Sequence, residues 1–259
     1  MNARENNQSA LRQTMQHIKS MPGLAVCFIL IFSVVYLLPM LYSFFMKTGQ
    51  PPIGWLFFAN MIAGLIISIV ILPYVSAGFY GQIFCRMEKQ NYPQGFFKHA
   101  RQNFKQFFLI NLFLLGLKLV FHIIPFSLLP IFFGASEHFL QINRIFSYYV
   151  SGVEFIFALL FLFAYPLATL GYFSQQKLRP IATSPKVVAK HIVKIWPLVI
   201  LLAIQYFYSI GLRLIVDSRY ISIPNSLISS SLEFVMIVMS FVYLSKTLFS
   251  GLEFNFSTD

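Results

Sequence analysis

The stretch SMPGLAVCFILIFSVVYLLPMLYSFFM, residues 20 to 46, contains 27 successive residues without a charge. A helix rises about 1.5 Å per residue, so about 20 apolar residues are enough to cross a hydrocarbon core about 30 Å thick. The stretch therefore predicts a membrane-spanning helix. It follows a polar N-terminal segment and is longer than the roughly 7 to 15 apolar residues of a cleavable signal peptide, so we expect it to remain in the protein.

Five more segments of this kind follow. Residues 48 to 85 hold 38 uncharged residues, enough for a span and a loop, and residues 155 to 176 hold 22. Three other apolar segments, near 106 to 133, 195 to 216 and 227 to 249, are interrupted or flanked by a charge. Of all residues 58% are hydrophobic and 10% charged, where an ordinary soluble domain has about 25% charged residues. The sequence predicts an all-α polytopic membrane protein with six transmembrane helices in a single integral membrane domain, residues 1 to 259.

Lys and Arg residues divide unequally between the two ends of these spans. Of the 19 such residues, 14 lie at one end and four at the other, and Lys118 lies inside a span. Because cytoplasmic flanks retain positive charge during insertion, we expect both termini in the cytoplasm and outer loops near residues 47 to 54, 134 to 147 and 217 to 226. Cys27 and Cys85 then lie near cytoplasmic ends of spans, where no structural disulfide is expected.

One unit recurs three times along the chain, at about residues 8 to 88, 94 to 178 and 183 to 252. Each unit begins with a short basic segment, runs out through one span and returns through the next. This pattern predicts three repeated helical hairpins, each preceded by a basic amphipathic interfacial helix. Ser184 and Pro185 suit the N-cap and first turn of the third such helix. The basic faces of the second and third helices consist of Lys98, Arg101 and Lys105, opposite Phe97, Ala100, Phe104 and Phe108, and of Lys186, Lys190 and Lys194, opposite Val188, Ile192 and Ile195.

These basic segments have two interpretations. Their side chains either contact anionic lipid headgroups, which makes membrane lipids the expected partner, or serve only as topological signals in cytoplasmic linkers. A second copy of the chain or another membrane protein is a further partner that the sequence leaves open. Nucleic acid is not an expected partner despite the net charge of +11, because the basic residues lie next to the spans and alternate with Phe and Val.

The returning spans share a pattern of small residues near their cytoplasmic ends. Tyr74, Tyr165 and Tyr243 take equivalent positions, and small residues follow each of them. Pairs of small residues four apart let helix backbones approach closely in lipid. We therefore expect the pairs Ala77 with Gly81 and Gly64 with Ser68 to lie at helix contacts.

A resemblance rests on two of these segments. The sequence PYVSAGFYGQIF (73 to 84), followed by Glu88, Lys89 and Gln90 and then by GFFKHARQNFKQFFL (95 to 109), resembles the uncharacterised six-span bacterial inner-membrane families of the YciC type. The resemblance implies a location in the bacterial cytoplasmic (inner) membrane and an architecture of repeated basic helices and hairpins. It implies no catalytic residues.

Motifs of known chemistry are missing from the sequence. It has no HExxH or CxxC pair, no phosphate-binding glycine-rich loop and no GxSxG turn, so we expect no catalytic residues, no cofactor, no metal site and no enzymatic activity. Ionisable residues inside spans are the exception, because each one is costly in lipid unless it is paired. They are Lys118, His122, Glu154 and Glu233. The helix rise places Lys118 and both glutamates at similar depths, roughly 8 to 10 Å below the outer face, so we expect Lys118 to face the interior and to pair with one of them.

Two functions follow from these observations. The first is a non-enzymatic accessory, scaffold or lipid-environment component of the envelope, for which tiny loops and basic surface helices suffice. The second is a transporter or channel-like carrier for a small solute or lipid, in which the buried ionisable residues act as a relay. A cavity lined by Lys118, Glu154 or Glu233 would favour the carrier. Pairing of these groups in a closed bundle would favour the scaffold.

Overall fold

The structure, a computed structural model, describes residues 3–47, 62, 64–88, 95–123, 125, 139–173, 179–215 and 222–248. Regular structure in these ranges is helical throughout. Among the described residues, four helices are long and apolar enough to cross a membrane, or up to six if each of two bent helix pairs forms one span. The four are Gly64–Met87, Phe96–His122, Tyr148–Gly171 and Pro224–Ser245. The chain is thus an all-helical protein with the dimensions of a multi-pass membrane protein.

Eleven helical elements follow one another within the described residues. Two of them, η1 and η2, are single π-helical turns that adjoin α4 and α5. The helices α7 and α11 begin at Phe139 and Ser222, inside the segments 134 to 147 and 217 to 226 that were predicted as outer loops. Beyond Lys47, the predicted loop at 47 to 54 lies outside the described residues. In chain order the elements are α1 (Ala3–Ser20), α2 (Pro22–Lys47), η1 (Ile67–Ile71), α4 (Leu72–Met87), α5 (Phe96–Lys118), η2 (Leu119–Ile123), α7 (Phe139–Leu160), α8 (Ala164–Phe173), α9 (Pro180–His191), α10 (Trp196–Ile215) and α11 (Ser222–Leu248).

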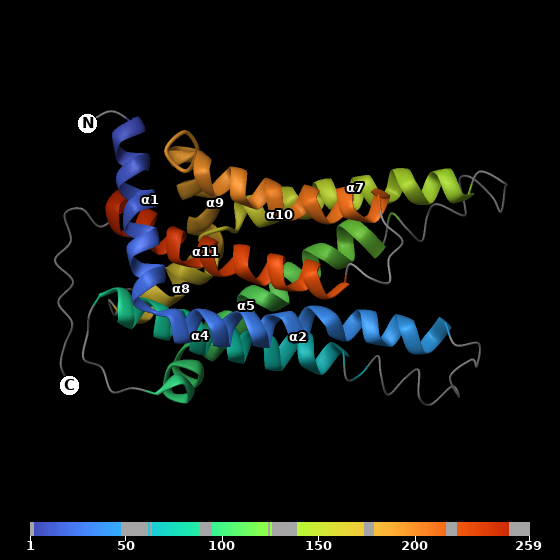
Figure 1. Cartoon of the computed structure of the whole chain (residues 1–259), viewed down its shortest axis with the longest axis horizontal. Coiled ribbons are helices and arrows are strands. Elements are labelled where there is room, and N and C mark those ends of the chain that lie inside the picture. The colour runs from blue at the N-terminus through green and yellow to red at the C-terminus, as the bar shows by residue number, and fades with distance from the viewer. Residues whose placement is uncertain are drawn as a thin grey trace.

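The long helices run roughly along one axis, and α1 lies across one end of them (Figure 1). The helix α4 packs most extensively against α5, and α2 packs against α11. The helix α10 contacts both α7 and α11, while α8 contacts α5, α9 and α4. The two most extensive contacts therefore join helices from different predicted hairpins.

Two of the three predicted interfacial helices are separate elements. The helix α1 meets α2 at 88°, and α9 meets α10 at 112°. Pro22 and Pro197 stand at the first and second positions of the following helices. Proline has no backbone N–H to donate, and its ring collides with the preceding turn. Each helix therefore ends before its proline and the chain changes direction there.

The predicted separate helix at 95 to 106 is wrong, because α5 runs without a break from Phe96 to Lys118. This segment contains no proline, and α4 holds its first turns. A Cβ atom added to Gly78 would lie 2.6 Å from the Phe96 ring, and one added to Gly81 would lie 2.6 Å from Cβ of His99. The two glycines form a notch that receives the start of α5, as expected for the small-residue face at Gly81. Phe97, predicted on the membrane-buried face, is 73% exposed.

The second predicted small-residue contact is wrong. Gly64 is exposed, and a Cβ atom there would have no other atom within 4 Å. Ser68 lies in η1, where its carbonyl accepts a hydrogen bond from the amide of Asn111 at 2.6 Å. The contact at this level of α4 and α5 is thus made by a polar side chain and not by close backbone approach.

The span formed by α7 and α8 is interrupted at residues 161 to 163. Pro166, in the first turn of α8, cannot donate to the carbonyl four residues earlier, which accounts for the break. The hydroxyl of Ser184 fills the gap in hydrogen bonding: it donates to the carbonyl of Leu160 at 2.8 Å and accepts from the N–H of Phe163 at 3.1 Å. Ser184 therefore lies inside α9, which begins at Pro180, and the predicted N-cap at this serine is wrong.

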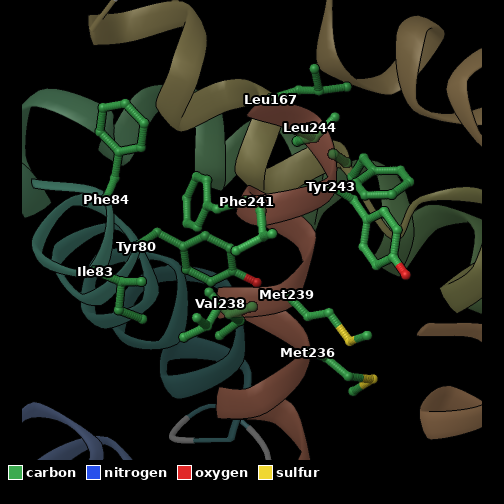
Figure 2. Packing of buried hydrophobic residues seen from close by; sticks show 14 of the residues in the cluster. Tyr80, Ile83, Phe84, Leu167, Met236, Val238, Met239, Phe241, Tyr243 and Leu244 are labelled. Carbon is green, nitrogen blue, oxygen red and sulfur yellow. The ribbon is translucent and has the colours of Figure 1, made fainter. Parts of the chain in front are cut away.

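Aromatic side chains form the centre of the bundle. Phe28 of α2 contacts Phe79 of α4 and Phe234 of α11, with ring centroids 5.2 and 5.4 Å apart. Figure 2 shows Tyr80 reaching from α4 toward α11, where Phe241 and Val238 lie beside it. The outward faces are apolar as well, which suits lipid as the surrounding solvent. Exposed apolar side chains include Val26, Leu30 and Val34 on α2 and Ile200, Ile204 and Phe207 on α10.

Candidate functional site

A cavity of 110 Å³ lies between α2, α4, α5, α8 and α11. One carboxylate, two phenol hydroxyls, one amide and one aliphatic hydroxyl supply its polar atoms, and the rest of its lining is apolar. A site with a few polar groups in an otherwise apolar enclosure is typical of small-molecule binding. The lining residues are Phe32, Val35, Leu72, Pro73, Ser76, Tyr80, Asn111, Tyr165 and Glu233.

The start of α4 places three of these side chains on one face. Pro73, Ser76 and Tyr80 are spaced three and four residues apart, which aligns them along a helix. Pro73 also cannot donate to the carbonyl four residues before it, inside η1, and this explains the wider π turn there. The carbonyl of Ser68 in that turn accepts the hydrogen bond from Asn111, which fixes Asn111 at the cavity wall.

An aromatic cluster, defined as Tyr80, Phe84, Phe107, Tyr165 and Phe241, adjoins the cavity, and its two tyrosines line it. The ring centroid of Tyr80 lies 5.3 Å from that of Phe107, 5.8 Å from Tyr165 and 6.0 Å from Phe241. The ring of Phe84 lies 5.6 Å from that of Phe241. Phe84 and Phe241 follow the cavity residues toward the C-terminal ends of α4 and α11. The cluster therefore extends from the cavity toward the C-terminal ends of α4 and α11.

Glu233 is the acidic residue of this site. It belongs to α11, is half-buried, and interacts electrostatically with both Tyr80 and Tyr165. None of the nine residues that the structure places around the cavity carries a positive charge. The other eight lining residues contribute aromatic and aliphatic groups, hydroxyls and one amide.

The other predicted ionisable residues lie elsewhere. The ammonium of Lys118 is 3.1 Å from the carboxylate of Glu154, which confirms the predicted pairing. The Lys118 side chain is 51% exposed, so the prediction that it faces the bundle interior is wrong. Lys118 ends α5 at its contact with α7, where the rings of Phe121 and Phe157 meet at 5.2 Å. This contact lies on the periphery of the bundle, which explains the exposure.

His122 lies in η2, one turn beyond Lys118, and does not line the cavity. Within the described part of the chain its Nε2 atom is buried without a hydrogen-bond partner. The structure therefore divides the predicted ionisable set: Lys118 and Glu154 form one pair, and Glu233 lies in the cavity.

The six residues predicted to contact lipid headgroups are all exposed: Lys98, Arg101, Lys105, Lys186, Lys190 and Lys194. The helices α1 and α9 and the start of α5 lie toward the same end of the bundle (Figure 1). Burial, and then the neighbouring Lys194 and Lys190, lower the pKa of His191. The exposed lysines Lys186 and Lys190 carry positive charge on α9.

The described residues contain no group of three His, Cys, Asp or Glu side chains that could hold a metal ion. Cys27 and Cys85 are both free thiols. The Cys85 thiol lies 3.6 Å from Nε2 of His99, buried between α4 and α5. Two ligands fall short of the four that a structural zinc site uses, and this pair contributes to helix packing.

Several residues of the cavity did not stand out in the sequence. Asn111 is a polar residue within an apolar span, and Pro73 marks a helix irregularity, so both carry a local signal. Tyr80 and Ser76 carry none, because their role depends on which helices surround them.

Comparisons with family models, with curated proteins and with solved structures find no match to this chain.

Proposed function

We propose that this chain is a carrier that binds a small polar solute in the cavity at Glu233 and moves it into or across a membrane. The observation that carries this proposal is a carboxylate placed in a largely apolar cavity between five helices of a bundle with an apolar exterior. No enzymatic step is part of the proposal. Of the two functions derived from the sequence, the carrier is the one that a cavity lined by Glu233 favours.

The energetics of a buried carboxylate support this choice. An ionisable residue within a span costs at least about 2.5 kcal/mol near the bilayer centre, so such residues generally mark substrate or ion pathways. An apolar side chain at position 233 would fill the same space without that cost. The volume of 110 Å³ is several times the roughly 10 to 15 Å³ that one water molecule requires, so the cavity has room for a solute.

Access to the cavity from water can be measured with cysteine variants. In a chain with Cys27→Ser and Cys85→Ala, Ser76→Cys places a thiol in the cavity wall, and Ser230→Cys places one in the packed contact of α11 with α2. A carrier predicts that a membrane-impermeant thiol reagent modifies Ser76→Cys at least about tenfold faster than Ser230→Cys. Equal, negligible rates at both positions would contradict the carrier.

A scaffold or accessory component of the envelope is the second candidate. The ion pair of Lys118 with Glu154 and the close packing of the rings in the aromatic cluster favour it. It requires no access to the cavity, so the labelling experiment separates it from the carrier. Under this alternative the partner is another membrane protein or a second copy of the chain, which crosslinking in native membranes can detect.

The proposal includes a location in the bacterial cytoplasmic membrane, six spans arranged as three hairpin units, and both termini in the cytoplasm. The asymmetry of Lys and Arg supports this orientation. Alkaline phosphatase fused after residue 50 or 140 should be active, and fused after residue 95 or 183 inactive. The reverse pattern would invert the orientation. The resemblance to six-span families of the YciC type stays part of this proposal.

Contact with anionic lipid is also proposed for the exposed basic residues of α5 and α9. Each Lys or Arg close to an anionic surface contributes about 1 kcal/mol. Peptides covering residues 95–106 and 180–194 should therefore bind vesicles that contain phosphatidylglycerol and not vesicles of phosphatidylcholine alone. Equal binding to both would reduce these residues to topological signals.

A further inference from the structure

The π turn before α4 is completed by a side chain from another helix. We propose that Asn111 is a latch that holds this turn, and that its release lets α4 change register and opens the cavity. The latch is argued from hydrogen bonding alone. The opening step rests on the proposed carrier function and identifies the part of that same site that moves.

The π turn leaves one backbone carbonyl without a donor from its own helix. In η1 the N–H of Leu72 donates to the carbonyl of Ile67, five residues earlier. In this register the carbonyl of Ser68 would accept from residue 73. Residue 73 is a proline, which has no N–H. The Ser68 carbonyl therefore needs a donor from outside its helix.

Asn111 of α5 supplies that donor. Its side-chain amide donates to the Ser68 carbonyl at 2.6 Å. Lipid offers no hydrogen-bond donor, so a backbone carbonyl that stays unpaired within a span costs free energy. The amide thus stabilises the register in which Ser68 lacks a backbone partner.

An α-helical register has no use for this bond. In that register the N–H of Leu72 would donate to Ser68, four residues earlier, and Pro73 would leave the carbonyl of Ile69 unpaired. Successive residues of an α-helix are about 100° apart around its axis, so the unpaired carbonyl would no longer face Asn111. Asn111 therefore favours the π register, and losing its bond shifts the balance toward the α register.

The latch lies at the edge of the cavity. Leu72, Pro73 and Asn111 all line the cavity. Pro73 is buried, whereas Leu72 and Asn111 are half-buried and Ser68 is exposed. The bond thus joins the walls formed by α4 and α5 where the cavity approaches the surface of the bundle. A change of register breaks this link, so the two walls can separate and admit a solute.

The second π turn provides a control. η2 ends at Ile123, two residues before Pro125, just as η1 ends at Ile71, two residues before Pro73. The equal spacing supports proline as the cause of both turns. The residues that the structure places around the cavity do not include Pro125.

Thermal unfolding of the full-length protein in detergent tests the latch. Asn111→Leu keeps the size of the side chain and removes the donor, so the midpoint should fall by about 2 to 6 °C. Pro73→Ala returns an N–H to the turn, which lets the backbone satisfy Ser68 in either register. In the Pro73→Ala background, Asn111→Leu should lower the midpoint by less than about half as much, whereas in the Pro125→Ala background its full effect should remain. Equal effects in all three backgrounds would overturn the latch.

Thiol labelling tests the opening step in the chain without its own cysteines. Because labelling follows the fraction of open molecules, Asn111→Leu should speed the reaction of Ser76→Cys at least about fivefold and leave Ser230→Cys unchanged. Pro73→Ala should also speed it, because it removes the cause of the π turn. Pro125→Ala should not.

Each outcome decides one step. A Ser76→Cys thiol that reacts equally fast with and without Asn111→Leu would overturn the opening step and leave the carrier standing. A thiol that reacts only after Asn111→Leu would support the opening step and contradict the carrier, and one that never reacts would overturn both. If Asn111→Leu does not fold, recovery by Pro73→Ala and not by Pro125→Ala supports the latch, and failure to recover overturns it. Labelling in the Pro73→Ala variant then decides the opening step.

Discussion

Ser184→Ala is expected to destabilise the protein more than any other removal of a single hydroxyl outside the cavity. The hydroxyl of Ser184 bridges the break between α7 and α8, because it donates to Leu160 and accepts from Phe163. Ser184 is fully buried, so neither backbone group can turn to bulk water once the hydroxyl is gone. Two polar groups are thus left without this partner by the loss of one oxygen atom.

The magnitude follows from the number of groups affected. A buried backbone group that loses its partner costs about 1 to 3 kcal/mol. Two such groups, with partial relaxation of the break, give an expected loss of about 2 to 4 kcal/mol. A change of 1 kcal/mol shifts the unfolding temperature of a chain of this size by about 2 to 4 °C, so the midpoint in detergent should fall by roughly 4 to 16 °C.

The matched control is Ser231→Ala. Ser231 also donates a hydroxyl to a backbone carbonyl, that of Leu227 at 2.7 Å, but on an exposed face of an unbroken helix. Its removal should change the free energy of unfolding by less than about 0.5 kcal/mol. If thermal unfolding, followed by circular dichroism, shows the same midpoint for both variants, Ser184 does not hold the break and the account of this region is wrong.

Three further predictions concern helix contacts. Gly81→Ala should destabilise the protein by about 1 to 3 kcal/mol, because its Cβ would lie 2.6 Å from His99. Gly152→Ala, where a Cβ would have no atom within 4 Å, should be neutral or stabilise the protein by up to about 1 kcal/mol. Equal effects of the two variants in thermal unfolding would rule out the notch. Tyr243→Phe removes the 2.8 Å hydrogen bond from the phenol to the Asn7 side chain. The rate of amide hydrogen exchange should therefore rise at least about tenfold throughout α1. Unchanged exchange rates would mean that apolar contacts alone hold α1 in place. A double-mutant cycle of Lys118→Met and Glu154→Gln in lipid nanodiscs should give a coupling free energy of unfolding above about 1 kcal/mol. Exposed ion pairs in water typically give about 0.2 to 1 kcal/mol. Zero coupling would mean that Lys118 only extends toward the membrane–water interface.

Length and composition were enough to predict the helical membrane architecture. Lipid leaves few options to a chain, because every backbone polar group inside it must be satisfied within a helix or barrel. The directions of the helices were harder to predict. Pro22 and Pro197 can be read from the sequence as helix starts, but no proline follows the similar basic pattern at Lys98, Arg101 and Lys105. There the direction of the helix is set by the notch on α4. Such a notch depends on two helices in contact and cannot be read from one segment.

The ionisable residues show the same division. Depth along a helix can be counted from the sequence, and it correctly brought Lys118 to the level of Glu154. Depth does not determine rotation about the helix axis. The sequence therefore left open which glutamate pairs with Lys118 and wrongly turned Lys118 inward. The structure separates the two glutamates because α7 presents Glu154 to the end of α5, whereas α11 presents Glu233 to the cavity.

The three tyrosines at equivalent positions of the returning spans show how far repetition in the sequence extends into the structure. Tyr74 contacts Phe104 with ring centroids 5.8 Å apart, Tyr165 lines the cavity, and Tyr243 binds Asn7. The surroundings of the three tyrosines differ. Tyr74 contacts α5, which has no break, Tyr165 belongs to α8, which follows a break, and Tyr243 belongs to α11, which packs against α1. The break matters most for the cavity: Tyr165 is two residues beyond Phe163, whose N–H is held by Ser184 of α9. The position of the Tyr165 ring thus depends on a hydrogen bond with Ser184 of α9, a basic helix at the end of the bundle. The repeated pattern predicts where the tyrosines lie along the spans. The irregularities of the helices, such as the break before α8, determine what each tyrosine contacts.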